Sequence, residues 1–123
     1  GYPNLLIMGG LQGSYQFNIT DMLQTQGDHI AACIAHARER GVQSMDATQE
    51  AEDAWVQKVI RSRGKTSWSE GCTPGYYNNE GQPIEGRRAV LNSMAFPEGP
   101  VAYFQYTAGW RSTGDFEGLD FRP

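Results

Sequence analysis

Apolar positions recur at helical spacing in three stretches of the chain. Between residues 20 and 39 they fall three or four residues apart, and Gly41 stands where this pattern stops. A second such stretch follows Thr48, a residue suited to an N-cap, and runs to Gly64, which suits a left-handed C-cap. A third extends from residue 100 to about 111. The pattern therefore predicts three helices.

Strand-like patterns lie near the two ends of the sequence. Leu5–Met8 is a short continuous apolar run, typical of a strand buried on both faces. Loosely alternating apolar positions from residue 116 to 121 predict a short terminal strand. Residues 42–47, between the first two helices, are expected to be a plain connection. The fold class is therefore an α+β fragment, because two strands are too few for an independent sheet.

A long irregular loop is expected between the second and third helices. Residues 64–86 are rich in Gly, Ser, Asn, Pro and Tyr and follow no helical or strand period. Loops of this length are uncommon unless they are functional or disordered, and Trp68, Tyr76 and Tyr77 favour docking over disorder. The chain is expected to be one segment, residues 1–123, made of a strand, loop and helix (1–41), a second helix (42–64), a long loop (65–97) and a terminal helix and strand (98–123).

Composition and charge exclude several classes of function. Ten Lys and Arg against fourteen Asp and Glu leave a formal charge of -4, which does not suit a nucleic-acid-binding surface. The apolar run at Leu5–Met8 is far short of the roughly 20 residues that cross a bilayer, so no membrane span is expected. Cys33 and Cys72 are the two cysteines, which favours free thiols in a reducing compartment. We expect a cytoplasmic protein.

A glycine-rich stretch, Gly9–Gly13, lies between the expected first strand and first helix. Its spacing differs from the dinucleotide fingerprint G-x-G-x-x-G, and no second strand with an acidic end follows. The small residues do allow another chain segment or a flat ligand to approach the backbone. The start of the following helix, capped by Asn18 or Thr20, would offer unpaired N–H groups to electron-rich oxygen.

Residues suited to a metal or to hydrolytic chemistry are few. His29, Cys33 and His36 fall roughly on one helix face and each could ligate zinc, but no fourth ligand or catalytic carboxylate accompanies them. A partly buried cysteine with surface histidines is the favoured interpretation, and no metal site is predicted. No nucleophile elbow is present, so no catalytic residue is assigned in this chain.

Taken in order, several segments resemble the C-terminal part of Baeyer-Villiger monooxygenases and related flavin-containing monooxygenases. The resemblance covers essentially the whole chain, and its order and spacing matter more than any one match. The matching segments are Tyr2–Leu5 leading to Gly9–Gly13, then Gln24–Gln26, then Ala47–Trp55, then Ser67–Trp68 with Gly71 and Pro74–Gly75, and finally Gly114–Leu119.

The resemblance implies the C-terminal piece of an enzyme that uses FAD and NADPH. Such enzymes insert one oxygen atom of O2 into a ketone through a C4a-peroxyflavin, and the cofactor carries the difficult chemistry. Leu5–Met8 would complete the FAD-binding domain of a flavoprotein with two dinucleotide-binding domains. The N-terminal remainder of the same protein would hold most of the FAD and NADP, together with the family's fingerprint His and catalytic Arg.

The resemblance also implies roles for five residues. Thr20 matches the position where the family contacts the flavin, through its backbone N–H. Tyr15, Gln16 and Phe17 match the bulge that lines the substrate pocket. Trp68 matches the tryptophan that donates a hydrogen bond to NADP from a mobile loop, although composition alone favours a tryptophan that anchors a loop to its own core.

Two alternatives to ketone oxygenation stay open. One is a related flavin enzyme that oxygenates nitrogen or sulfur. The other is a stand-alone binding module that reuses this fold without redox chemistry. The length of the native reading frame separates the module from both enzymes, because only the enzymes need a preceding FAD-binding region.

Overall fold

The computed structural model describes residues 2–9, 13, 18–60, 73–75, 80 and 96–123. Within these residues the chain forms three helices and two short strands, so the expected α+β class is confirmed. The elements are α1 (Ile19–Glu39), β1 (Ser44–Ala47), α2 (Gln49–Ile60), α4 (Pro100–Thr113) and β2 (Leu119–Arg122).

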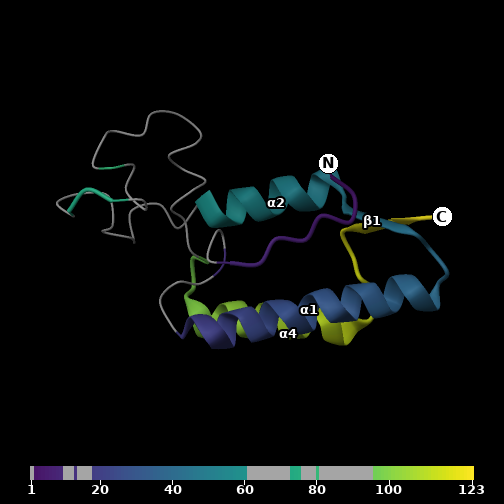
Figure 1. The fold of residues 1–123 in the computed structure, drawn as a ribbon, viewed down its shortest axis with the longest axis horizontal. Helices are drawn as coiled ribbons and strands as arrows, with labels where there is room; N and C mark the ends of the chain where they lie inside the picture. The colour runs from purple at the N-terminus through teal and green to yellow at the C-terminus, as the bar shows by residue number, and fades with distance from the viewer. Residues whose placement is uncertain (1, 10–12, 14–17, 61–72, 76–79, 81–95) are drawn as a thin grey trace.

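The helices are arranged in two layers (Figure 1). α1 and α4 lie side by side, and α2 runs across from them with the N-terminal residues 2–9 passing through the space between. The two strands lie at one end of this arrangement, close to both chain termini. Residues 96–99, which lead into α4, lie at the other end.

Helix α1 begins and ends where local chemistry favours it. The Asn18 side chain accepts a hydrogen bond from the Thr20 backbone N–H at 3.1 Å, which makes Asn18 the N-cap. Asp21 in the first turn and Arg38 in the last turn complement the helix dipole. Gly41 follows with φ 67°, a left-handed conformation that glycine adopts without strain. The predicted span of residues 20 to 39 is confirmed to within one residue.

The other two helices also follow the sequence pattern. At the start of α2, the Thr48 hydroxyl accepts a hydrogen bond from the Ala51 N–H at 3.2 Å, which confirms the predicted cap. Its predicted end at Gly64 lies outside the described residues. α4 begins at Pro100, whose fixed φ suits the first helical turn, and ends at Gly114, which is left-handed with φ 74°.

The sheet differs from the sequence prediction. β1 pairs with β2 in antiparallel fashion, from Ser44 opposite Arg122 to Ala47 opposite Leu119. The expectation that residues 42–47 are a plain connection was therefore wrong. Met45 is the one buried residue of β1, so the strand carries almost no apolar pattern of its own. β1 is a strand because it pairs with β2, which lies far along the chain.

The structure forms no strand at Leu5–Met8, where the sequence predicted one. Within the described residues these four have no strand partner, and their exposed fractions range from 42% to 75%. Among the described residues, no hydrogen bond involves the backbone of Leu6, Ile7 or Met8. A strand needs a neighbouring strand to satisfy its N–H and C=O groups, and the described part of this chain supplies none there.

Asn4 covers the edge of β1 that faces away from β2. Its backbone N–H donates to the Met45 carbonyl at 2.9 Å, and its side-chain oxygen accepts from the Met45 N–H at 3.0 Å. The side-chain amide also donates to the Gln43 carbonyl at 3.1 Å. Asn4 has φ 64°, a left-handed conformation that asparagine tolerates better than most residues. A single residue thus stands where a third strand would pair.

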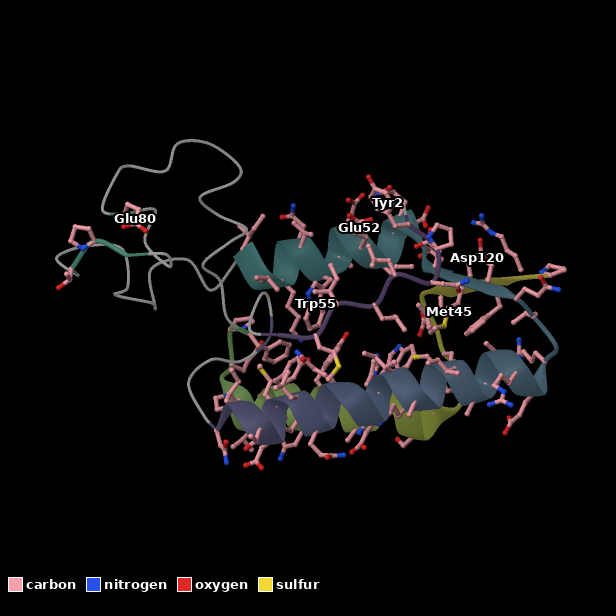
Figure 2. All side chains as sticks on the ribbon, viewed as in Figure 1. Tyr2, Met45, Glu52, Trp55, Glu80 and Asp120 are labelled. Carbon is pink, nitrogen blue, oxygen red and sulfur yellow. The ribbon has the colours of Figure 1, made fainter. Side chains whose placement is uncertain are left out.

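Two groups of buried side chains form the core. The sheet-end cluster consists of Cys33, Met45 and Phe116, and the loop-end cluster consists of Met22, Phe96 and Tyr103. Both clusters are built on α1, which spans the distance between them. Figure 2 shows Met45 pointing from β1 and Trp55 pointing from α2 toward the α1–α4 layer. Trp55 packs against the loop-end cluster.

Candidate functional site

The predicted flavin contact, Thr20, lies at the exposed start of α1. Its backbone N–H donates to Asn18, and its hydroxyl also approaches the Asn18 side-chain oxygen at 2.5 Å. Asp21 places a negative charge in the same turn. The role of Thr20 stays a prediction. The other predicted site residues, Tyr15, Gln16, Phe17 and Trp68, lie outside the described residues.

A side-chain amide next to this helix start was missed as a site residue. Gln26 Oε1 accepts from the Gly9 N–H at 2.9 Å, and Gln26 Nε2 donates to the Gly9 carbonyl at 2.9 Å. Gln26 Nε2 also lies 3.4 Å from the Tyr103 hydroxyl. A signal was present in the sequence, since Gln26 occupies a position of the apolar stripe of the first helix, where a polar side chain needs a partner.

Gly13 brings the glycine-rich stretch against the same part of α1. Its carbonyl accepts from the Phe96 N–H at 2.7 Å. A Cβ atom at Gly13 would lie 3.2 Å from Gln26 Nε2, a tight contact, and 3.5 Å from Met22 Sδ, an ordinary van der Waals contact. The expectation that small residues here let another chain segment approach the backbone is confirmed.

Aromatic rings gather beside this junction. Trp55 and Phe96 have centroids 5.8 Å apart, and Phe96 and Tyr103 meet edge to face at 5.7 Å. The Lys58 ammonium lies 4.7 Å from the Phe96 ring centroid and 4.2 Å from that of Tyr106. These contacts join the last turns of α2 to the residues that lead into α4, and such cation–π pairs are attractive.

A groove of about 980 Å³ lies between α2 and the α1–α4 pair. Leu5 and Leu6 line it from the N-terminal segment, Trp55 from α2, and Tyr103 and Trp110 from α4. Charged side chains are also present along it, among them Glu50 and Lys58. Its volume is that of a pocket for a small molecule or a short chain segment.

The helix face with two histidines and a cysteine is used for packing. His29 lies against Trp110 with ring centroids 4.8 Å apart, and His36 stacks on Phe116 at 4.0 Å. The histidines are therefore partly buried, where surface positions were expected. Within the residues that the structure describes, no three metal-ligating side chains of the His, Cys, Asp or Glu type are grouped around a common point.

Burial controls the titration of two groups on this face. Burial lowers the pKa of His29 below its usual value, and the nearby positive charge of Arg111 lowers it further. Burial raises the pKa of the free Cys33 thiol, and this effect exceeds the opposing attraction of Arg111. A thiol that holds its proton is a poor nucleophile and a poor metal ligand, which agrees with the packing contacts on this face.

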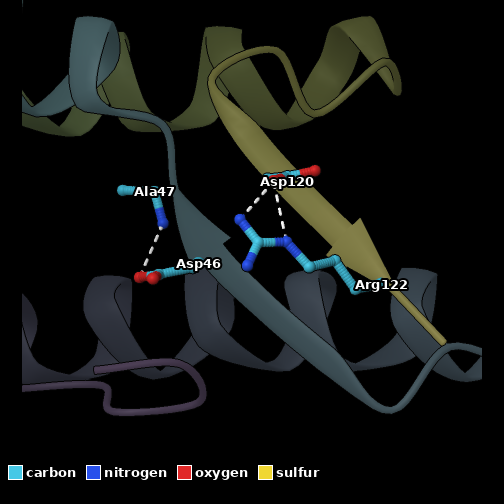
Figure 3. A network of polar contacts seen from close by, with 4 residues as sticks. All are labelled: Asp46, Ala47, Asp120 and Arg122. Carbon is cyan, nitrogen blue, oxygen red and sulfur yellow. Dashed lines mark hydrogen bonds and ion pairs between the residues drawn. The ribbon is translucent and has the colours of Figure 1, made fainter. Parts of the chain in front are cut away.

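The ion pair on β2 belongs to the surface of the sheet (Figure 3). Arg122 Nη2 and Nε lie 2.6 Å and 2.9 Å from Asp120 Oδ2. The two side chains are 60% and 46% exposed, and pairs this open contribute about 0–1 kcal/mol. Asp46, also drawn there, accepts from the Ala47 N–H at 3.1 Å. These contacts support the strands and do not form a binding site.

No family model matches the sequence. Among the described residues, no helix combines the length and the apolar character that crossing a membrane requires.

Curated relatives match the chain from end to end. It is 37% identical over 123 residues to pentalenolactone D synthase of Streptomyces arenae, a match that covers 99% of this chain and 20% of the relative. It is 33% identical over 124 residues to Baeyer-Villiger monooxygenase 4 of Dietzia sp., which covers 100% of this chain and 20% of the relative. The chain thus spans about a fifth of the length of the curated relatives it matches.

Solved structures with a similar fold come from the same group of enzymes. A steroid monooxygenase bound to NADP superposes with a TM-score of 0.72 at 19% identity, over 99% of this chain and 21% of that one. A polycyclic ketone monooxygenase from Thermothelomyces thermophila gives a TM-score of 0.70 at 25% identity, over 98% and 21%. The arrangement of helices and strands described above is therefore one that such enzymes contain.

Proposed function

We propose that this chain is part of an FAD- and NADPH-dependent enzyme that inserts one oxygen atom of O2 into a ketone. The chain is related along its whole length to Baeyer-Villiger-type flavin monooxygenases, as its sequence motifs predicted. The main support for this proposal is the share of each sequence that the matches cover. The similarity extends over at least 98% of the chain, yet over only about a fifth of each relative. The chain is then the C-terminal segment, and an N-terminal remainder binds most of both cofactors.

The N-terminal segment supports this division of the protein. Leu5–Met8 is apolar, extended and exposed, and it is fixed at both ends, by Asn4 on β1 and by Gly9 on Gln26. Exposed apolar residues with unpaired backbone groups are unfavourable in water. In the proposed whole protein, Leu5–Met8 adds a strand to the sheet of the FAD-binding domain, which would bury these side chains and pair their backbone.

The start of α1 is the proposed contact with the flavin. It is exposed, and a helix N-terminus favours electron-rich oxygen. The Thr20 N–H already donates to Asn18, so a flavin oxygen would share or replace that bond. FAD, when bound and reduced by NADPH, supplies the activation of O2. This chain would orient the ring and keep water from it, with Tyr15, Gln16 and Phe17 beside the ketone.

Trp68 is proposed to donate a hydrogen bond to NADP. In the full-length protein, Trp68→Ala should raise the KM for NADPH or increase the fraction of NADPH oxidised without product. Both follow from poorer retention of the nicotinamide over the flavin. Steady-state NADPH oxidation with peroxide detection measures both effects, and unchanged values would remove this role from Trp68.

The reading frame and an activity assay test the proposed function. We expect several hundred residues before this segment, with two G-x-G-x-x-G fingerprints and a flavin-loaded protein in the cytoplasm. Purified full-length protein should oxidise NADPH in a ketone-dependent way and form an ester or lactone that carries one atom of isotopically labelled O2. A reading frame without an FAD-binding region would contradict the proposal. Oxygenation of amines or sulfides alone would replace ketones as the substrate class.

A further inference from the structure

We propose that Gln26 is a positioning residue for the cofactor and substrate side of the enzyme, an inference that rests on the proposed function. Gln26 fixes the glycine-rich stretch on α1 by pairing with both backbone groups of Gly9. Through Gly13, which lies against the same amide, it sets the point from which the chain continues to Tyr15, Gln16 and Phe17.

The two bonds between Gln26 and Gly9 are matched in a way that few side chains allow. Each is 2.9 Å long, one with the amide oxygen as acceptor and one with the amide nitrogen as donor. A neutral side chain needs both a donor and an acceptor to pair with one residue's N–H and C=O together. Glutamine has both, whereas leucine has neither and ionised glutamate cannot donate.

The surroundings of Gln26 explain why a polar residue stands there. Met22 is fully buried one helical turn before it, and Tyr103 lies at hydrogen-bonding distance from its amide. A polar group on such a face costs free energy unless it is paired. Gly9 provides that pairing, so the amide and the glycine backbone satisfy each other at a partly buried position.

The position of Gly13 extends the effect of Gln26 along the chain. Gly13 is buried, fits without a side chain against Gln26 and Met22, and accepts a hydrogen bond from Phe96. Four residues connect Gly13 with Asn18, which caps α1. Gly13 and Asn18 are both held on α1, so Gln26 helps to fix one of the two points between which Tyr15, Gln16 and Phe17 lie in the sequence.

The Gln24→Leu variant gives a matched control for Gln26→Leu. Gln24 lies on the same helix, loses the same amide on substitution, and is exposed, with a hydrogen bond to Asp28 on the surface. The two variants therefore differ in whether the lost amide held Gly9. Gln26→Glu serves as a second variant, because its carboxylate keeps the acceptor for the Gly9 N–H and loses the donor for the Gly9 carbonyl.

The experiment compares these variants in the full-length, FAD-loaded protein. For Gln26→Leu we expect kcat/KM for the ketone to fall about 10- to 100-fold, because small misplacements near the reaction have effects of this size. More NADPH should be consumed without product, while the KM for NADPH changes little. Gln26→Glu should lie between Gln26→Leu and the parent, and Gln24→Leu should match the parent.

A second readout does not depend on turnover. Amide hydrogen exchange at Gly9 should speed up about tenfold or more in Gln26→Leu and remain at the parent rate in Gln24→Leu, because exchange reports local opening of a hydrogen-bonded N–H. If the parent is active and the Gln26 and Gln24 variants behave alike in both assays, the inference is overturned. A parent without FAD-dependent NADPH oxidation would instead refute the proposed function, and exchange at Gly9 would still report whether Gln26 holds it.

Discussion

The two ends of the molecule are held together in different ways. The sheet-end cluster is closed by a strand ladder and by ring contacts in which Phe116 meets His36 at 4.0 Å and Trp110 at 5.1 Å. The loop-end cluster lies beside two hydrogen-bonded contacts to glycine backbone, one from the Gln26 side chain to Gly9 and one from the Phe96 backbone N–H to the Gly13 carbonyl.

The sheet end contributes to stability, whereas the proposed cofactor and substrate contacts belong to the loop end. Every residue proposed to meet the flavin, NADP or the ketone belongs to a stretch that begins or ends at the loop-end cluster. Substitutions at the sheet end should therefore change stability while leaving the coupling of NADPH to product unchanged, and substitutions at the loop end should change both.

The largest expected effect is that of Phe116→Ala at the sheet end. Phe116 is 8% exposed and packs against three rings, and loss of such a side chain costs about 3–5 kcal/mol. Hydrogen exchange of the β1 and β2 amides should rise accordingly. The product formed per NADPH should stay at the parent value in the folded fraction, and a lower value would erase the distinction between the two ends.

Gly118→Ala should have the next largest effect. Gly118 has φ 87°, and a Cβ atom there would lie 2.9 Å from the Ala51 Cβ, so both strain and overlap oppose the substitution. We expect a loss of about 1–3 kcal/mol in local stability. Gly114→Ala is the control, since φ is 74° but nothing lies within 4 Å of the added Cβ. Thermal unfolding should rank Gly118→Ala as clearly the less stable, and equal midpoints would show that overlap is unimportant.

A pair of helix caps compares the two ends directly. Asn18→Ala removes the cap of α1 at the loop end, and Thr48→Ala removes that of α2 beside the sheet. Each should cost about 1 kcal/mol, because one helix N–H loses its acceptor. Asn18→Ala alone should also shift the visible absorption spectrum of the flavin, since α1 begins at its proposed contact. A matching shift in Thr48→Ala would argue against that placement.

The smallest expected effect is a change in pH dependence at His29. Burial, and to a smaller extent Arg111, lowers the pKa of His29 in the folded chain. Neutral His29 therefore contributes its full share of stability above the pKa of the unfolded state, about 6.5. That contribution is lost as the pH falls toward the lower pKa of the folded state. His29→Phe keeps a ring against Trp110 and cannot be protonated. The drop in unfolding midpoint between about pH 7.5 and about pH 5.5 should shrink in this variant. An unchanged drop would assign the acid sensitivity to other groups.

The helices could be predicted from the sequence because their causes are local. The apolar spacing of α1, the hydroxyl of Thr48 and the glycine after α4 all act within a few residues of the elements they define. The resemblance motifs worked for the same reason, since they lie in order along one stretch of chain.

The terminal strand expected over residues 116–121 is observed as β2, but its pairing with β1 and the loop-end junction could not be predicted because their causes are distant. β1 exists through pairing with β2, and its own residues offer a single buried methionine. Leu5–Met8 has the composition of a strand, but no partner for it is present in the described part of the chain. Gln26 interrupts an apolar stripe in the sequence, yet only the structure identifies Gly9 as the group that it pairs with.

Asn4 has a consequence for how the isolated segment behaves in solution. An uncovered sheet edge can recruit the edge of another molecule and start aggregation. Asn4 occupies the edge of β1 with three hydrogen bonds and turns the chain away at a left-handed residue, so no further strand can join at Met45. Self-association of the separated segment would therefore not start at the Met45 edge of β1, whereas the exposed apolar Leu5–Met8 stretch offers a surface for it.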